Sequence, residues 1–448
     1  MIITTAEGRY IIADDQELTA DLLDEYISAH DATVAEDLEP LMNAYRGDYA
    51  IFYQAAKESY KPDNRIGVGF ARYIVETFEG FFLGIPIQIS ADDEAVNEYI
   101  HYQGQYTGQD DTNAELSRLV SIYGWAYEMY YVDELGQVGT TYLSPADAFM
   151  IFDESILERP RYFVRLYTDA HGIRRGSVSD ASVVRYFTCD GQTAYTGEER
   201  VHGFGDVPAT EYVMNDTRQS LIAPVMSMID AYNKALSEKA NDVDYFADAY
   251  LKILGAKLKE EDLRTIRDDR IINFAGIHDG NLIVEFLQKP NGDSTQEHLI
   301  DRLERLIFQI SMVANISDDS FGTASGQALK FKLHAMSSLA KTKERKFVSG
   351  MNRRYGVIFS NPVTGLPADG WTGIKYKFTQ NIPSNLLDEA NTAKALAGIV
   401  SKETQLRALS VVDDPRAEVE RIMDEEKEYL MGGYPDERTG TAESTDEG

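Results

Sequence analysis

The stretch HLIDRLERLIFQISMVANISDDSFGTASGQALKFKL, residues 298–333, decides how the second half of this chain is organised. Its first part carries apolar residues at helical spacing: Leu299, Leu303, Leu306, Ile307 and Ile310. This spacing predicts a helix from Ser294 to Asn315, which at about 1.5 Å per residue is roughly 33 Å long. Two acids and a glycine-containing loop follow, and a second long helix is predicted from about Gln327 to Phe359.

The loop in this stretch resembles a phosphate cradle in general outline, but its spacing argues against a nucleotide site. A Walker A loop needs a lysine and a hydroxyl residue directly after its second glycine. Here Gly326 is followed by Gln327 and Ala328, and the first lysine, Lys330, comes too late. A helix rather than an apolar strand leads into the loop. We therefore expect no nucleotide and no other cofactor.

Other catalytic or metal chemistry is poorly supported by the sequence. Asp318 and Asp319 could bind a hard cation loosely, but no EF-hand spacing follows, and tandem acids beside a glycine are more typical of a helix cap and a solvated turn. Three histidines are candidate bases, and none lies near a recognisable nucleophile motif: His202, His278 and His334. We expect no metal site and no enzymatic activity.

The composition narrows the class of protein. The chain of 448 residues carries 43 Lys+Arg against 74 Asp+Glu, a net charge of −31, which is too acidic for a protein that wraps DNA through a broad basic face. Cys189 is the only cysteine, so no internal disulfide is expected. We expect no secretory signal and no membrane association, because no apolar run approaches the roughly 20 residues that span a bilayer.

Helical and strand periodicities alternate along the chain. Helices are predicted at Leu18–His30, Tyr49–Tyr60, Asn64–Phe82 and Ile222–Asp244, in two further segments ending near Tyr123, and at Asn385–Val400, Thr404–Leu409 and Pro415–Tyr429. A tyrosine-rich antiparallel sheet is predicted between Gly124 and Pro208, with hairpin strands Tyr127–Val132 and Val138–Leu143, then Arg161–Thr168 and Gly176–Thr188. A small β-α-β-β insert is predicted from Tyr250–Leu254, Glu260–Arg267, Ile271–Phe274 and Leu282–Leu287, and a return strand at Ile374–Phe378. The fold class is α+β.

Charge is distributed unevenly over the second half. Between Ala328 and Tyr355 eight cations are opposed only by Glu344: Lys330, Lys332, Lys341, Lys343, Arg345, Lys346, Arg353 and Arg354. Most of them fit either a solvated helix face or a seam of ion pairs between subunits. Lys330 and Lys332 directly follow the loop, and contact with phosphate is the alternative for these two.

This order of parts resembles the portal proteins of tailed bacteriophages, siphophage type. The resemblance covers roughly Asn64 to Tyr429, and four stretches carry it: PVMSMIDAYNKALSEKANDVDYFADAYL (224–251), HLIDRLERLIFQISMVANISDDSFG (298–322), SGQALKFKL (325–333) and KTKERKF (341–347). It implies a phage portal fold with a mixed wing domain, a two-helix stem, a small β-α-β-β clip, a long kinked helix and a helical crown.

The resemblance also implies a division of the chain into segments. These are a wing of N-terminal helices and antiparallel sheet (1–221), a stem helix (222–244), the clip (245–293), a second stem helix (294–316), a tunnel loop (317–326), the long helix and return strand of the wing (327–384), the crown (385–431) and a disordered acidic tail (432–448).

The resemblance further implies a function. Such a protein forms a ring, usually a dodecamer, at one capsid vertex of the virion, and is assembled in the host bacterial cytoplasm. Double-stranded DNA passes through its channel, and its partners are the large terminase subunit, head-completion or adaptor proteins, and the major capsid and scaffolding proteins. The DNA-facing residues would be those of the tunnel loop: Asp318, Asp319, Ser320, Phe321, Gly322, Thr323, Ala324, Ser325 and Gly326. Lys330 and Lys332 would contact phosphate, and Lys257, Lys259 and Arg264 would lie in a docking surface on the clip.

Two alternatives from other classes remain. One is a phage enzyme that processes DNA, such as a nuclease or an NTPase, which would need a carboxylate cluster for a metal or a phosphate loop. The other is a structural protein of the virion that is not a portal, such as a minor capsid or adaptor component.

Overall fold

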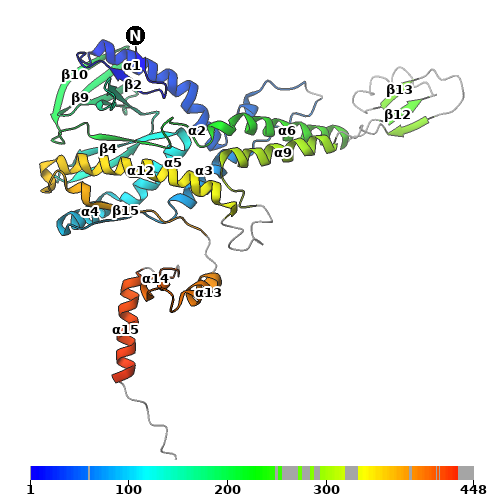
Figure 1. The fold of residues 1–448 in the computed structure, drawn as a ribbon. Helices are drawn as coiled ribbons and strands as arrows, with labels where there is room; N and C mark the ends of the chain where they lie inside the picture. The colour runs from blue at the N-terminus through cyan, green and yellow to red at the C-terminus, as the bar shows by residue number, and fades with distance from the viewer. Residues whose placement is uncertain are drawn as a thin grey trace, which may run out of the picture. The chain divides into compact units, whose positions relative to one another are not determined.

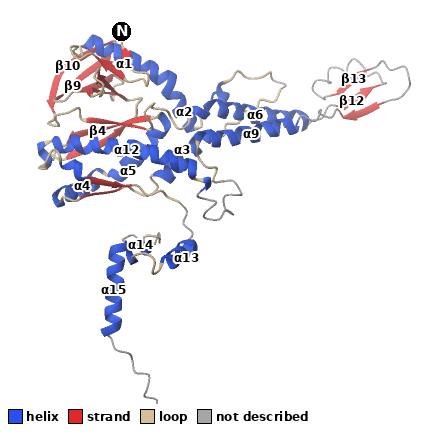
Figure 2. Cartoon of the chain, in the orientation of Figure 1, coloured by secondary structure: helices blue, strands red, loops and turns tan. Residues whose placement is uncertain are grey.

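The structure is a computed structural model that describes residues 2–58, 61–247, 251–254, 271–274, 283–286, 293–317, 331–382, 386–409, 411–412 and 414–431. The chain divides into two compact units. The first comprises Met1–Asp319 and Phe331–Asn381 and holds the sheets and the long helices (Figure 1). The second comprises Ser320–Lys330 and Ile382–Gly448 and includes the C-terminal helices. Helices and strands are both abundant, so the predicted α+β class is confirmed (Figure 2).

The larger sheet of the first unit has seven strands in the order β1-β2-β6-β7-β8-β9-β10. β2 pairs with β6 in parallel, and the other neighbours are antiparallel. The strands are β1 (Ile3–Thr4), β2 (Tyr10–Ile12), β6 (Ala148–Asp153), β7 (Pro160–Thr168), β8 (Arg174–Ser179), β9 (Val183–Asp190) and β10 (Gln192–Val201). The predicted meander therefore exists, but its segment Gly176–Thr188 is broken at a turn into β8 and β9.

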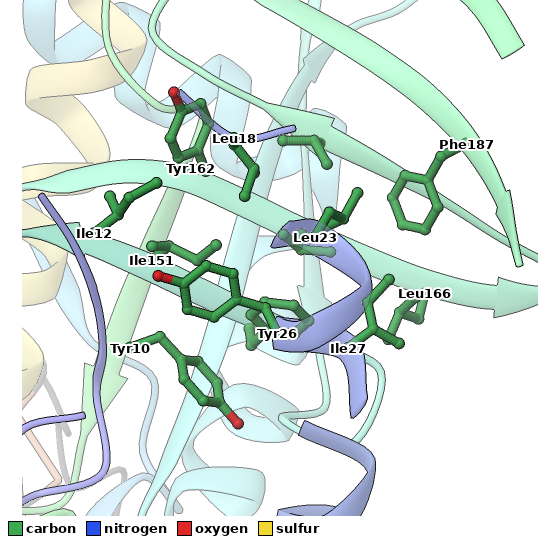
Figure 3. Packing of buried hydrophobic residues seen from close by; sticks show 13 residues of the cluster. Tyr10, Ile12, Leu18, Leu23, Tyr26, Ile27, Ile151, Tyr162, Leu166 and Phe187 are labelled. Carbon is green, nitrogen blue, oxygen red and sulfur yellow. The ribbon is translucent and has the colours of Figure 1, made fainter. Parts of the chain in front are cut away.

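Helix α1 (Ala20–Thr33) covers one face of this sheet, and the core lies between them (Figure 3). Leu23, Tyr26 and Ile27 of α1 pack on Ile151 and Val164 of the strands. Each such side chain contributes roughly 1.5–3 kcal/mol when buried. The Thr19 hydroxyl caps α1 by accepting a hydrogen bond from the amide of Leu22. The helix is thus fixed at its start and along its apolar face.

A three-stranded sheet, β11-β4-β5, packs beside the long helix of the unit. β4 (Trp125–Val132) and β5 (Val138–Leu143) form the predicted hairpin, and β11 (Ala209–Val213) pairs antiparallel with β4. The hairpin turn works because Gly136 takes a φ of 74° and the Asp133 carboxylate accepts backbone hydrogen bonds from Leu135 and Gln137. Tyr127, Tyr130 and Tyr212 of this sheet are buried, whereas Tyr131 and Tyr142 are exposed.

Further α-helices described in the first unit follow α1 along the chain. They are α2 (Glu39–Arg46), α3 (Phe70–Phe82), α4 (Glu94–Thr107), α5 (Gln109–Tyr123), α6 (Met226–Ala247), α9 (Asp293–Ser311) and α12 (His334–Ser360). A short π-helix (Val34–Leu38) joins α1 to α2. The return strand β15 (Ile374–Lys377) pairs with β3 (Gln88–Ala91), in agreement with the predicted strand at Ile374–Phe378.

The insert between α6 and α9 forms a third sheet in the order β13-β12-β14. β12 (Leu251–Leu254) is parallel to β13 (Ile271–Phe274) and antiparallel to β14 (Ile283–Phe286). The three strands lie where the sequence predicts them. The predicted helix Glu260–Arg267 lies outside the described residues.

Two predicted helices are wrong in extent. The segment Tyr49–Tyr60 forms only a 3₁₀ turn, Ala50–Tyr53, among its described residues. The helix predicted from Asn64 begins only at Phe70, because residues 64–68 run extended along α6 and use their backbone groups there. Helix α2 was not predicted at all.

The second unit contains α13 (Leu386–Leu396), α14 (Lys402–Leu406) and α15 (Pro415–Met431), close to the three helices predicted there. The Gln405 amide donates to the carbonyl of Ala393, and Arg416 pairs with Glu403, so the helices contact one another. Within the described residues, no helix combines the length and the apolarity needed to cross a bilayer.

Candidate functional site

Helices α6 and α9 lie side by side as a pair that projects from the sheets (Figure 1). The buried apolar residues of the pair are Ile229 and Tyr232 of α6 and Ile300 and Ile307 of α9. The polar ends are joined as well, because Gln296 donates to Asp242 over 3.1 Å and Lys239 forms an ion pair with Glu297. With 22 and 19 residues the two helices are about 33 and 28 Å long.

The segment before α3 lies extended along α6 as a polar ladder. The amides of Asn64, Ile66 and Val68 donate to the side chains of Asn241, Ser237 and Asn233, over 2.6, 2.9 and 2.8 Å respectively. The donors are two residues apart, as on one edge of a strand, and the acceptors are four apart, as on one face of a helix. All three acceptor side chains are buried. This ladder ties α6 to the segment that leads into α3.

The base of the predicted tunnel loop is anchored to α3 and α9. The Tyr73 hydroxyl accepts a hydrogen bond from the amide of Ile316 over 3.1 Å and lies 3.3 Å from the Ser317 hydroxyl. The Asn315 amide group donates to Glu304 of α9 over 3.3 Å. A cavity of about 740 Å³ opens beside these residues, and Tyr73, Phe308 and Ser317 are among its lining residues. The chain therefore leaves α9 along a fixed path as far as Ser317.

Most predicted site residues lie beyond this point. Asp318, Asp319, Ser320, Phe321, Gly322, Thr323, Ala324, Ser325, Gly326 and Lys330 lie outside the described residues, as do Lys257, Lys259 and Arg264. Lys332 is described, and it is helical and exposed directly before α12. The structure therefore describes only the two ends of the loop region.

The predicted cationic face of α12 is wrong for Lys343 and Arg354, which are fully buried. Lys346 and Arg353 are partly exposed and form ion pairs with Asp216 and Asp206. The sequence shows the charges but not their acidic partners, which come from distant segments. Lys341 and Arg345 are exposed, as a solvated face requires.

Lys343 joins α12 to α3 and α5. Its ammonium donates to Glu79 over 2.5 Å, to the carbonyl of Ser117 over 2.9 Å and to the Ser121 hydroxyl over 2.8 Å. It also lies 5.0 Å from the ring centre of Phe82. Burial lowers the pKa of Lys343, and the Glu79 carboxylate opposes that shift. All three donor positions of the ammonium are thus satisfied.

Arg354 joins the same helix to α5 and β4. Its guanidinium donates to Glu128 over 2.7 Å and to Asn113 over 2.7 Å. The hydroxyls of Tyr130 and Tyr212 donate to the same carboxylate, each over 3.1 Å. α12 can lie this close because Gly350 faces the Tyr212 ring, where a Cβ atom would come within 2.5 Å. Lys343 and Arg354 are about 16 Å apart along the axis, so α12 is fixed at two points.

The outer side of α9 carries an apolar seam, defined by Leu299, Leu303, Leu306 and Ile310. Leu299 and Ile310 are 51% and 47% exposed, and the two leucines between them are partly exposed. The spacing of four, three and four residues is that of a coiled-coil interface. The seam lies beside, not on, the face that packs on α6. Leu299 and Ile310, at the two ends of the seam, are therefore its most exposed members.

Among the described residues, no group of three or more His, Cys, Asp or Glu side chains is arranged to hold a metal ion. His202 is half-buried and bonds the backbone carbonyl of Asp180, and His334 is exposed at the start of α12. His278 lies outside the described residues. In the described part, buried ion pairs hold α12 to the core, and hydrogen bonds hold residues 315–317 at the base of the predicted tunnel loop.

Comparison with known sequences matches most of this chain to phage portal proteins. The family model described as "Phage portal protein, SPP1 Gp6-like" matches residues 24–430. The portal protein of Bacillus phage SPP1 is 23% identical over 423 residues, covering 87% of this chain and 82% of that protein. The portal protein of Clostridium phage phiCD119 is 25% identical over 242 residues, covering 53% of this chain and about half (52%) of that protein. A chain of the structure titled "Neck of empty GTA particle computed with C6 symmetry" matches with a TM-score of 0.46 at 12% identity, over 76% of this chain and 90% of that one.

Proposed function

The chain belongs to the family of SPP1 Gp6-like phage portal proteins, and from that premise we propose that its copies form a closed ring at one vertex of a phage capsid. The ring is the passage for viral DNA into the capsid during packaging and out of it during ejection. The protein is a component of the virion and, like its family, structural rather than enzymatic. The number of subunits that we propose is twelve.

The observation that carries the ring proposal is the apolar seam of α9. A helix in a monomer needs only one apolar face, and α9 already uses that face against α6. A ring gives the second face a partner, because each subunit presents the same helices to the next one. We assign α6 and α9 to the stem around the channel and residues 245–293 to the clip. Residues 1–221 and 327–384 form the wing. Residues 385–431 are the crown.

The loop of residues 317–326 is then the tunnel loop that faces DNA. Its anchored base, from Asn315 to Ser317, supports this assignment because it holds the loop at the end of a stem helix. The net charge of −31 favours sliding over binding, since an acidic wall repels the duplex over about 8 Å in physiological salt. Lys330 and Lys332 would supply the few contacts to phosphate that do not depend on sequence.

Deletion of Phe321–Ser325 separates assembly from transport. We expect rings of normal size from the deletion variant and a packaging yield at least tenfold below that of the wild type. Normal packaging by the deletion variant would show that the loop is not part of the mechanism.

Replacing Lys330 and Lys332 together by Ala should change the packaging rate or the retention of DNA. Lys341→Ala is the control, at an exposed position of the same helix region. Equal rates at several salt concentrations would exclude the phosphate contact.

The clip is the proposed docking surface for the large terminase subunit and later for head-completion or adaptor proteins. Reversing the charges of Lys257, Lys259 and Arg264 should weaken the stimulation of terminase by the ring, and full stimulation would contradict this assignment. Major capsid and scaffolding proteins would contact the wing and crown during assembly in the host bacterial cytoplasm.

A further inference from the structure

The turn between β6 and β7 presents two adjacent apolar side chains to solvent. Ile156 is 99% exposed and Leu157 is 64% exposed, and we call this pair the knob. Single exposed apolar residues are common on protein surfaces. An adjacent pair on a tightly ordered turn is different, because its position is fixed before any partner arrives.

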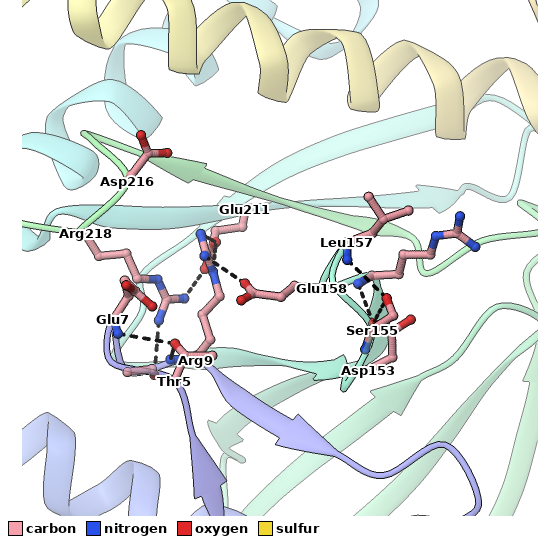
Figure 4. A network of polar contacts seen from close by, with 12 residues as sticks. Thr5, Glu7, Arg9, Asp153, Ser155, Leu157, Glu158, Glu211, Asp216 and Arg218 are labelled. Atoms are coloured by element: carbon pink, nitrogen blue, oxygen red, sulfur yellow. Dashed lines mark hydrogen bonds and ion pairs between the residues drawn. The ribbon is translucent and has the colours of Figure 1, made fainter.

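The turn that carries the knob is held from both sides (Figure 4). The Asp153 carboxylate accepts hydrogen bonds from the Ser155 amide, the Ser155 hydroxyl and the Arg159 amide, over 3.2, 2.7 and 2.9 Å. Glu158 takes a φ of 44°, a left-handed conformation that costs a non-glycine residue free energy. Its carboxylate accepts from the Arg9 guanidinium over 3.1 Å. A strained and strongly braced turn indicates a function for what it displays.

The bracing reaches into the core of the unit. Arg9 also donates to Glu211 of β11 over 3.0 Å. Arg218, which is itself buried, forms an ion pair with the same Glu211 and donates to the Tyr127 hydroxyl over 3.2 Å. Figure 4 shows Arg9, Glu158, Glu211 and Arg218 as one connected network. The knob is thus tied to the seven-stranded sheet and to the sheet β11-β4-β5.

A surface cavity of about 660 Å³ lies at the opposite end of strand β6. Its wall combines apolar side chains, Val34, Met42, Leu119 and Ala146, with polar ones, Glu39, Asn43 and Arg46. Ala146 stands just before β6, whose six residues span about 20 Å, and the knob follows the other end of that strand. Val34 begins the short π-helix between α1 and α2, a rare conformation that occurs frequently at functional sites.

We propose that the knob of one subunit inserts into this cavity of the next subunit in the ring. The inference rests on the proposed ring and names a contact within it. A head-to-tail ring requires two different complementary surfaces on each copy, whereas a two-fold dimer requires one self-complementary surface. The knob and the cavity are two different surfaces, separated by the length of a strand. A cavity of several hundred Å³ is large enough for two aliphatic side chains.

The borders of the two surfaces carry charges of both signs. Exposed Glu154 and Arg159 flank the knob, and exposed Glu39 and Arg46 line the cavity. Each acid can therefore face a base across the contact. Such border charges fix the register of an interface more than its affinity.

Cysteine cross-linking tests the contact, because the chain has a single cysteine that can be removed. In a Cys189→Ser background, Leu157→Cys is combined with Met42→Cys, and in a second variant with Leu119→Cys. A disulfide forms only when the two Cβ atoms come within about 4.5 Å. We expect mild oxidation of assembled rings to give a ladder of covalent oligomers on non-reducing gels. The control pairs Leu157→Cys with Leu135→Cys, at the exposed tip of the β4–β5 hairpin, and should give no ladder.

A second variant keeps the test independent of disulfide geometry. Ile156→Asp should leave the monomer folded, because that side chain is almost fully exposed, and should weaken each subunit contact by about tenfold or more. Leu135→Asp is the matched control.

If the Ile156→Asp variant assembles normal rings and neither cysteine pair gives a ladder, the inference is overturned. The portal function would then stand, and the knob would contact another partner. A dimer band from Leu157→Cys alone would also overturn it, because it would mean a two-fold contact. A wild-type chain that forms no rings would contradict the proposed function and, with it, this contact.

Discussion

The Arg354 guanidinium and the Glu128 carboxylate form an ion pair of 2.7 Å in which neither side chain reaches solvent. The two residues are 226 positions apart in the sequence. Their contact holds the long helix α12 against strand β4, and the buried Lys343–Glu79 pair does the same at α3. The two buried pairs therefore fix α12 at two separate points, one on β4 and one on α3.

Removing one partner of the Arg354 pair should be strongly destabilising. Arg354→Met leaves the Glu128 carboxylate buried without its counter-charge, and the free energy of unfolding should fall by about 3–5 kcal/mol. Urea unfolding of the unassembled subunit measures this. The adjacent Arg353→Met is the control, because Arg353 pairs with the partly exposed Asp206 and should cost about 1 kcal/mol or less. Equal losses for the two variants would show that the Arg354 pair has no special role.

A substitution in α6 should remove one hydrogen bond of the polar ladder with residues 64–68 and leave the others in place. Ser237→Ala removes the acceptor of the Ile66 amide and should destabilise the subunit by about 1–3 kcal/mol. Hydrogen exchange at Ile66 should become faster, while exchange at Val68, which bonds to Asn233, should change less. Ser227→Ala is the control at an exposed position of α6. Unchanged protection of Ile66 would contradict the ladder.

Stability should fall in mild acid because of His30. Burial lowers the pKa of His30 from 6.5 to about 4, against a smaller opposing effect of a hydrogen bond with the backbone of Ala146. The unfolded chain therefore binds a proton that the folded chain does not, between about pH 6.5 and 4. This stability is fully present above pH 6.5 and falls as the pH drops, by about 2 kcal/mol at pH 5.

The matching variant is His30→Leu, which cannot titrate. Its loss of unfolding free energy between pH 7 and pH 5 should be smaller than that of the wild type by about 2 kcal/mol. Urea unfolding at the two pH values gives both differences. An equal loss in the two proteins would mean that other groups cause the acid sensitivity.

The apolar seam of α9 should be needed for assembly but not for folding. Leu299→Gln together with Ile310→Gln should prevent ring formation at concentrations where the wild type assembles, since each side chain contributes about 1–3 kcal/mol per contact when buried. Circular dichroism should remain unchanged, because both side chains are about half exposed in the subunit. Val363→Gln, at a similarly exposed position, is the control. Light scattering that finds intact rings from the double variant would remove the seam from the interface.

Local signals in the sequence predicted much of this fold. The β4–β5 hairpin follows from alternating apolar residues around Asp133 and Gly136, and α9 follows from its helical spacing. Both depend only on neighbours in the chain. The expectation that residues 318–333 hold no phosphate loop also rests on local spacing, because that chemistry fixes the distance between a glycine and a lysine.

The features that were not predicted depend on distant partners. Ile66 lies at helical spacing from Phe70, but three side chains of α6, 165 to 177 positions away, accept hydrogen bonds from the amides of residues 64, 66 and 68 instead. Lys343 and Arg354 read as part of a basic helix face, because the sequence does not show that Glu79 and Glu128 lie beneath them. The apolar seam was visible as a pattern, whereas its exposure in the subunit was not.

The most direct test of the central claim is negative-stain microscopy of the purified wild-type chain, with the subunit number counted from class averages. We predict rings of uniform size with a central hole wide enough for a DNA duplex. Particles without a central hole, or monomers at every concentration tested, would contradict the claim that this chain forms the DNA passage of a capsid.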